Sequence, residues 1–329
     1  MGSVKITGVG MHSGNLSNLT VRKTDSGGII FVKNGMRIPA RFDNVTDTSL
    51  RNTTIGQGKN RVKTIEHLMA ALFILGIQNA EIEIDNDEIP ILDGSADELI
   101  QKLKIIKPAE KKHYLVIKNY VIARESEIKL PLWLRLIYMI KGRRRDGFVE
   151  LSPAKGARLE LTSEIDYPKI PVIGQQKIKF QFNYSNWEKS VKLFLELIAK
   201  SRTFGTESEW KWLKKRNMGR GADGRNVLAV NQTGDDTLND MYNQSPELKQ
   251  MILEKYGHLL PADASVVKRH FKDEFVRHKI IDAMGDLFAS GYFIVGKYNS
   301  YKGGHALNNL ALRKLFANPE NYEIQNYYK

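Results

Sequence analysis

The sequence predicts an α+β protein of two domains with related architecture and a functional site between them. Its 329 residues, 42% hydrophobic and 26% charged, are typical of a globular chain long enough for about two domains. Strands, a helix, a strand and a second helix follow one another in residues 1–111, and a similar order recurs in residues 112–329. The polar segment 107–112, which contains Pro108, is typical of a linker between the two.

The N-terminal domain is predicted to open with strands and hairpins, because short apolar runs alternate with glycine-containing turns in residues 1–60. Thr64 is the predicted N-cap of a helix that Gly76 ends. Ser95 and Glu98 form a predicted capping box for the next helix. The elements predicted after residue 60 are a helix over 64–75, a strand over 80–84 and a helix over 95–103.

The C-terminal domain is predicted to repeat this theme, with two stretches, 125–146 and 240–270, that look like additions. The second stretch is polar and contains a predicted helix over 246–256. The strands are predicted over 114–122, 148–152, 157–165, 176–182 and 292–299, and the helices over 186–200, 273–290 and 307–316.

The first addition contains an almost wholly apolar run, 130–140, followed by the basic cluster 141–145. The run is too short to span a bilayer. With Trp133 and Tyr138 beside the cations, residues 130–145 suit a segment lying on an anionic bilayer surface. The alternative is a buried element closed by a solvated turn.

The chain has no cysteine, which excludes disulfides and thiolate metal sites, so any metal must be held by His, Asp or Glu. No basic-then-apolar signal and no apolar run of about 18 residues is present, so the cytoplasm is the expected compartment. The net charge of +13 indicates either simple solubility or an anionic partner.

Glu66 and His67, together with a second group on a predicted helix, are the strongest candidates for a site. His278 and Asp282 are four residues apart and share one helix face, and Asp286 follows after another four. Two imidazoles and a carboxylate with a neighbouring base are what a zinc hydrolase needs. A solvent-facing polar stripe is the alternative.

Three further segments contain candidate residues. His305 follows two glycines and can act as a general acid or stabilise negative charge, although it can equally be a surface histidine. Residues 202–205 offer a cation, the Thr203 hydroxyl and the Phe204 ring, and His12 lies in a glycine-rich turn. Residues 219–224 fit G-x-G-x-x-G by letters but are interpreted as a flexible loop.

Six segments in this order resemble the family of UDP-3-O-acyl-N-acetylglucosamine deacetylases, the zinc amidases of bacterial lipid A synthesis. The resemblance covers residue 5 to about 316. The segments are GVGMHSG (8–14), TIEHLMAAL (64–72), ILDGSA (91–96), RTFG (202–205), HKIIDAMGD (278–286) and GHALNN (304–309).

The resemblance implies two related two-layer α+β sandwich domains packed together, with one catalytic zinc ion (Zn²⁺) at their interface. It implies hydrolysis of the N-acetyl group of a UDP-linked, acylated N-acetylglucosamine, which releases acetate and a free amine. The implied zinc ligands are His67, His278 and Asp282.

The resemblance also implies roles for eight other residues. Glu66 would be the general base that activates water, and Thr203 would donate a hydrogen bond to the oxyanion. His305 would be a cationic partner or general acid, held by Asp286. The implied substrate-binding residues are Lys279 and Lys302 near the diphosphate, Phe204 by the sugar and acyl chain, and His12 in the cleft.

Some features depart from the family pattern or leave alternatives open. Residues 219–226 differ from the usual loop, Thr206 replaces an apolar residue, and both additions are atypical. The alternatives are a zinc amidase acting on a different N-acyl sugar, or a non-catalytic basic protein that binds membranes or nucleic acid. A monomer is expected, with peripheral contact to the inner membrane through 130–145 and with no nucleic-acid partner.

Overall fold

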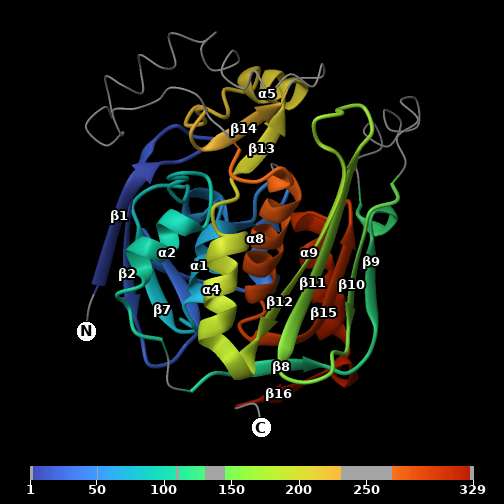
Figure 1. Cartoon of the computed structure of the whole chain (residues 1–329). Helices are drawn as coiled ribbons and strands as arrows, with labels where there is room; N and C mark the ends of the chain where they lie inside the picture. The colour runs from blue at the N-terminus through green and yellow to red at the C-terminus, as the bar shows by residue number, and fades with distance from the viewer. Residues whose placement is uncertain (1–2, 50, 109–110, 130–144, 231–268, 327–329) are drawn as a thin grey trace.

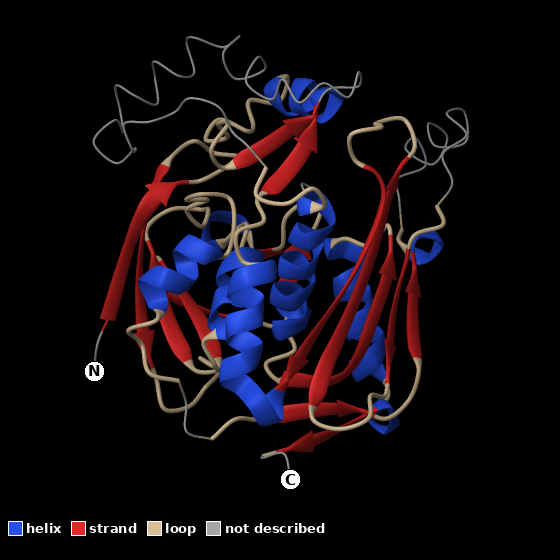
Figure 2. Cartoon of the chain, in the orientation of Figure 1, coloured by secondary structure: helices blue, strands red, loops and turns tan. Residues whose placement is uncertain are grey.

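Two β-sheets enclose a group of helices (Figures 1 and 2). This computed structural model describes residues 3–49, 51–108, 111–129, 145–230 and 269–326. Strand β11 (Arg158–Tyr167) alternates buried and partly exposed residues, because one face of its sheet packs on the helices. Helices and sheets thus occupy separate layers, and the predicted α+β fold class is confirmed.

The first sheet has the strand order β1-β2-β7-β3-β4. Only β3 and β7 are parallel; the other neighbours are antiparallel. All nine residues of α1 (Glu66–Ile74) are buried, because its sequence has almost no polar face to turn outward. The other elements of this part are β1 (Ser3–Val9), β2 (Leu16–Lys23), β3 (Ile29–Lys33), β4 (Met36–Pro39), β5 (Val45–Asp47), β6 (Thr54–Ile55), β7 (Ala80–Ile84) and α2 (Asp97–Leu103).

The second sheet has the order β12-β11-β15-β10-β9, and β8 joins it by pairing with both β15 and β16. The central strand β15 runs parallel to β11 and β8 and antiparallel to β10. Besides β11, the elements of this part of the chain are β8 (Tyr114–Ile117), β9 (Val121–Arg124), β10 (Phe148–Ser152), β12 (Gly174–Asn183), α4 (Trp187–Leu197), α8 (Glu274–Phe288), β15 (Phe293–Tyr301), α9 (His305–Ala317) and β16 (Tyr322–Gln325).

A third, smaller unit lies beyond one end of α8 (Figure 1). It consists of the parallel strands β13 (Thr203–Thr206) and β14 (Val227–Val230), with α5 (Glu207–Lys214) between them in the chain. All four residues of β14 are buried, and Leu228, Ala229 and Val230 belong to an apolar cluster with Phe275 and Val276 of α8. This unit was not predicted from the sequence.

One close contact joins the two sheet-bearing parts of the molecule. A Cβ atom added at Gly285 of α8 would lie 1.9 Å from the backbone oxygen of Glu66, the first residue of α1. Only glycine permits this approach. The contact brings the start of α1 onto the C-terminal half of α8, and it therefore fixes where the side chains of the candidate site meet.

Most predicted elements are present, but two predicted caps are wrong. Thr64 does not cap α1: its φ is +60° and its hydroxyl donates to Glu88, because a tertiary contact outcompetes the local one. Ser95 and Glu98 form no capping box; Ser95 Oγ accepts from the Asp97 amide instead. The strand predicted over 114–122 is two strands, β8 and β9.

All strands of the first sheet precede residue 111 and all strands of the second follow it, which supports the predicted division there; the boundary itself stays a prediction. Most of 125–146 and nearly all of 240–270, including the predicted helix over 246–256, lie outside the described residues. Within the described part of the chain, no helix is both long enough and apolar enough to cross a membrane.

Candidate metal centre

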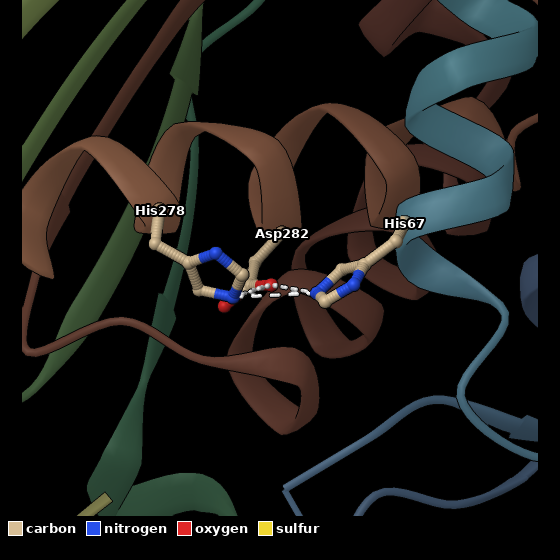
Figure 3. A group of neighbouring side chains, drawn as sticks. All are labelled: His67, His278 and Asp282. Atoms are coloured by element: carbon tan, nitrogen blue, oxygen red, sulfur yellow. Dashed lines mark hydrogen bonds and ion pairs between the residues drawn. The ribbon is translucent and has the colours of Figure 1, made fainter. Parts of the chain in front are cut away.

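Three buried side chains from two helices converge on one point (Figure 3). His67 comes from α1, and His278 and Asp282 come from α8. The two Nε2 atoms are 3.3 Å apart, and Asp282 Oδ1 lies 3.2 Å from His278 Nε2 and 3.6 Å from His67 Nε2. These residues form a group that can hold a metal ion, as the sequence predicted.

The spacing fits a tetrahedral zinc site. Ligands about 2.0–2.1 Å from one zinc ion at tetrahedral angles lie about 3.3 Å from each other. The three measured separations, 3.2–3.6 Å, are close to that value. The two buried imidazole nitrogens face each other at 3.3 Å, which places both within reach of one shared cation.

The surroundings favour the ligating form of each group. The Ser201 carbonyl lies 2.9 Å from His278 Nδ1, so Nδ1 donates and Nε2 presents its lone pair to the centre. Burial lowers the pKa of His67, which keeps that imidazole neutral. Burial opposes ionisation of Asp282, but the Lys279 ammonium and His278 hold its pKa well below the usual range. Lys279 Nζ lies 2.8 Å from Asp282 Oδ2.

Glu66 lies beside His67 with one oxygen fixed. Its Oε2 accepts a hydrogen bond of 2.9 Å from the Thr53 amide, which leaves Oε1 without a bond to Thr53. Burial, reinforced by Asp286 and Asp282 and opposed by His305, raises the pKa of Glu66 to about 8. A cation held by the neighbouring His67 would lower it again, so this environment suits a base that works near neutral pH.

His305 begins α9 and is held by Asp286, at 2.8 Å between Nδ1 and Oδ2. Burial alone would lower the pKa of His305, but the Asp286 and Glu66 carboxylates outweigh it and raise the pKa to about 10. The imidazolium form therefore prevails at neutral pH. The structure thus brings His305, Asp286 and Glu66 together.

Two residues that the sequence did not single out complete this network. Thr53 Oγ1 donates to Asp286 Oδ1 at 2.6 Å, and Asn308 Nδ2 donates to Asp286 Oδ2 at 2.8 Å. Asn308 lies inside the motif GHALNN, so the sequence indicated its position but not its contact with Asp286. Thr53 had no such signal: nothing in its local sequence distinguishes it from Thr54.

Thr203 and Phe204 are the first two residues of β13. The Thr203 amide donates to the Gly94 carbonyl at 2.8 Å. The Phe204 ring lies 5.1 Å from the Phe275 ring and 5.4 Å from Lys279 Nζ, so it borders the charged centre. No contact between Thr203 and the three candidate ligands is seen among the described side chains.

The cation next to Thr203 is structural. Arg202 is buried, and its Nε and backbone amide donate to Glu274 Oε1 at 2.9 and 3.0 Å. Glu274 is fully buried at the start of α8. This ion pair ties the beginning of β13 to the helix that bears His278 and Asp282.

His12 is buried in a loop that Glu88 holds. Glu88 accepts from the amides of His12 and Ser13 and from the Thr64 hydroxyl at 2.8–3.1 Å. Among the described residues, no group forms a hydrogen bond with the buried His12 Nδ1, so this atom can bond to a ligand. Burial lowers its pKa although Glu88 opposes the shift.

Residues 219–226 form a loop, as predicted, but its backbone is closely packed. The Gly221 amide donates to Met11 O at 3.0 Å, and a Cβ at Gly221 would lie 2.3 Å from Gly10 O. A Cβ at Gly94 would lie 1.6 Å from Asn226 O. The loop therefore packs against the His12 loop and against the segment around Gly94.

Lys302 is a further predicted site residue without a contact to the candidate ligands among the described residues. Its Nζ makes ion pairs of 3.3 Å with Asp146 and Asp166. Burial opposes its charge, but Tyr301 and these carboxylates together outweigh burial and raise its pKa. The described residues give it no contact with the candidate ligands.

The amino-acid sequence of this chain is similar to those of known proteins. The chain matches the family described as UDP-3-O-acyl N-acetylglycosamine deacetylase over residues 1–260 and 258–317. The UDP-3-O-acyl-N-acetylglucosamine deacetylase of Shewanella sediminis is 34% identical over 99% of this chain and 91% of that protein. The enzymes of the same name from Shewanella violacea and Shewanella baltica strain OS155 are each 33% identical, over 98% and 99% of this chain and 90% and 91% of those proteins.

Proposed function

We propose that this chain, which belongs to the UDP-3-O-acyl N-acetylglycosamine deacetylase family, removes the N-acetyl group of UDP-3-O-acyl-N-acetylglucosamine. Water adds to the amide carbonyl, the C–N bond breaks, and acetate and the free glucosamine amine are released. The observation that carries the proposal is the buried group His67, His278 and Asp282 with Glu66 beside it.

The donor set is best suited to zinc. It offers two imidazole nitrogens and one carboxylate oxygen, no thiolate, and three protein ligands, which is the composition of a catalytic zinc site with a coordination position left for water or substrate. When bound, zinc supplies Lewis acidity that polarises the amide carbonyl and acidifies a water molecule. The identity of the ion is part of this proposal.

The residues of the chain then supply the proton transfers. Glu66 takes a proton from the attacking water through its free oxygen, while the Thr53 amide keeps its other oxygen in place. Negative charge that develops on the carbonyl oxygen is met by the His305 imidazolium and by the Thr203 hydroxyl. The leaving nitrogen takes its proton from Glu66 or from His305, since both are protonated at that stage.

The substrate is proposed to lie between β13 and the His12 loop. Phe204 would contact the sugar and acyl chain, His12 would line the cleft, and Lys279 and Lys302 would face the diphosphate. Lys279 is next to the centre through its ion pair with Asp282. Residues 219–226 depart from the family pattern and pack on the His12 loop. If the substrate is a different N-acyl sugar, we therefore expect it to differ in the length of its acyl chain.

The active unit is proposed to be a monomer, since all the site residues come from one chain. The cytoplasm stays the predicted compartment. The predicted membrane contact of 130–145 falls, except for Arg145, outside the described residues.

The test is to measure metal content and acetate release on the same preparations. The wild type should bind about one zinc ion per chain and release acetate. His278→Ala should lose both, whereas Glu66→Gln should keep the metal and lose turnover by about 10²–10⁴-fold. His113→Ala, which removes an imidazole bonded to Asn326, is the matched control and should behave as wild type.

The outcomes separate the alternatives. Zinc without acetate release in the wild type points to a different N-acyl sugar, and a series of acyl-chain lengths then identifies it. Wild-type turnover in Glu66→Gln would contradict the role of the base. Absence of bound metal in the wild type would refute the proposal as a whole.

A further inference from the structure

We propose that the outer face of α5 docks onto an anionic lipid surface. The residues of this face are exposed and lie close together in the chain, and Trp212 is 42% exposed. We call them the α5 patch: Lys211, Trp212, Lys214, Lys215 and Arg216. The choice of a lipid rests on the proposed function, because that substrate has an acyl chain.

Two acidic residues near the α5 patch already have cationic partners. Glu209, on the same helix, is paired with Arg51. Asp223, in the loop that follows, is paired with Arg225. In the described part of the chain, no carboxylate lies within ion-pair distance of the last three cations of the patch. Within the described residues, Lys214, Lys215 and Arg216 therefore present positive charge that complements an anionic surface.

The helix separates an inward aromatic side chain from an outward one. Trp210 and Leu213 pack over Gly219, where an added Cβ would lie 2.9 Å from the Trp210 ring. Trp212 faces outward, with the Arg216 guanidinium 4.1 Å from its ring centre. A tryptophan whose ring is beside a guanidinium suits the boundary between lipid headgroups and acyl chains.

The α5 patch is also close in the chain to the proposed acyl-binding residue. Only two residues separate Phe204 from the start of α5. Leu228 and Val230 of β14 share an apolar cluster with Phe275 of α8. Strands β13 and β14 lie between α5 and α8 in Figure 1. A surface that holds lipid at α5 would thus bring an acyl chain to the end of the molecule where Phe204 lies.

The same cations could attract nucleic acid, but the exposed Trp212 and the acylated substrate favour a lipid. The two cases differ experimentally. A lipid surface would accept the Trp212 ring among acyl chains, whereas a duplex would engage the cations alone.

The experiment is vesicle co-sedimentation of the full chain, with phosphatidylcholine vesicles with and without phosphatidylglycerol. The wild type should bind only the anionic vesicles, and less so as salt is raised. Each cation near such a surface contributes about fivefold to binding, so the triple variant Lys214→Ser, Lys215→Ser, Arg216→Ser should bind about 100-fold more weakly. Trp212→Phe should remove a fluorescence change that the wild type shows with these vesicles.

The matched control is a triple variant that removes three exposed lysines of the α4 region: Lys189→Ser, Lys192→Ser and Lys200→Ser. It should retain most of the binding. Equal losses in both triple variants would show that overall charge, and not the α5 patch, is responsible. Binding to duplex DNA but not to vesicles would overturn the choice of lipid, and so would equal binding to both kinds of vesicle.

Acetate release from a dispersed short-chain substrate separates this inference from the proposed function. The α5 triple variant should keep wild-type turnover of that substrate, which also shows that it is folded. Vesicle binding without any turnover in the wild type would refute the proposed function and leave the docking surface standing. Turnover without vesicle binding would refute the docking surface alone.

Discussion

Gly285→Ala tests whether the contact between α1 and α8 sets the geometry of the site. The added Cβ would lie 1.9 Å from Glu66 O, which is 1.5 Å short of the 3.4 Å at which ordinary contact begins, and 2.7 Å from Glu66 C. The obstacle is backbone, so no rotamer change relieves it. The start of α1 must move away from α8 by more than 1 Å, and Glu66 and His67 must move with it.

The expected effect on catalysis exceeds the effect on stability. A displacement of about 1 Å in a catalytic group costs about 100-fold in rate. Overpacking costs about 1–3 kcal/mol, but alanine is about 1 kcal/mol better than glycine within a helix, so the net loss of stability is about 2 kcal/mol or less. Zinc affinity should also fall, because His67 moves relative to His278 and Asp282.

The assay compares kcat, KM, metal content and thermal midpoint of Gly285→Ala with those of Gly304→Ala. Gly304 precedes His305, has an extended φ of −176°, and an added Cβ there meets no atom within 4 Å. The control should therefore retain wild-type kcat. A Gly285→Ala enzyme with kcat within twofold of wild type and full metal content would refute the reasoning.

Three further predictions concern the surrounding network. Thr53→Val should lower kcat by about 10-fold or more at unchanged metal content, because it removes a hydrogen bond to a buried carboxylate; Thr53→Ser should restore most of it. Asp286→Asn should lower the pKa of His305 from about 10, so the alkaline limb of the kcat–pH profile moves to lower pH by about one pH unit or more. Glu274→Ala should reduce the free energy of unfolding by about 3–5 kcal/mol, because the buried Arg202 loses its ion pair with Glu274.

Each of these has its own decisive outcome. If serine and valine at position 53 behave alike, the hydroxyl has no positioning role. An alkaline limb that stays in place in Asp286→Asn would mean that His305 does not supply the essential proton. Glu188→Ala, which removes an exposed carboxylate from α4, should leave stability unchanged and is the control for Glu274→Ala.

The sequence predicted those parts of the site that lie at regular spacing on one element. His278, Asp282 and Asp286 recur every four residues, and a helix places them on one face whatever surrounds it. Glu66 and His67 are adjacent, so they enter the site together. Local periodicity of this kind also predicted most strands and the long helices correctly.

The parts that escaped prediction depend on contacts between distant segments. Thr53 and Asp286 are 233 residues apart, and no pattern near either one indicates the other. Thr64 has the sequence of an N-cap, yet Glu88 binds its hydroxyl. The strands β13 and β14 have four residues each, too few for an alternating pattern to stand out, and their pairing depends on the apolar cluster with Phe275.

The charges of the centre indicate why its residues are arranged as they are. Three carboxylates, those of Glu66, Asp282 and Asp286, face one ammonium, Lys279, and one imidazolium, His305. When Glu66 is ionised, this group has one net negative charge. The raised pKa of Glu66 favours its protonation, which removes that charge. A bound divalent cation would change the balance to one positive charge, so Glu66 would stay ionised and the centre would accept the single negative charge that the proposed reaction develops on the amide oxygen. Each buried charge therefore has a counterpart either in the resting site or in the transition state.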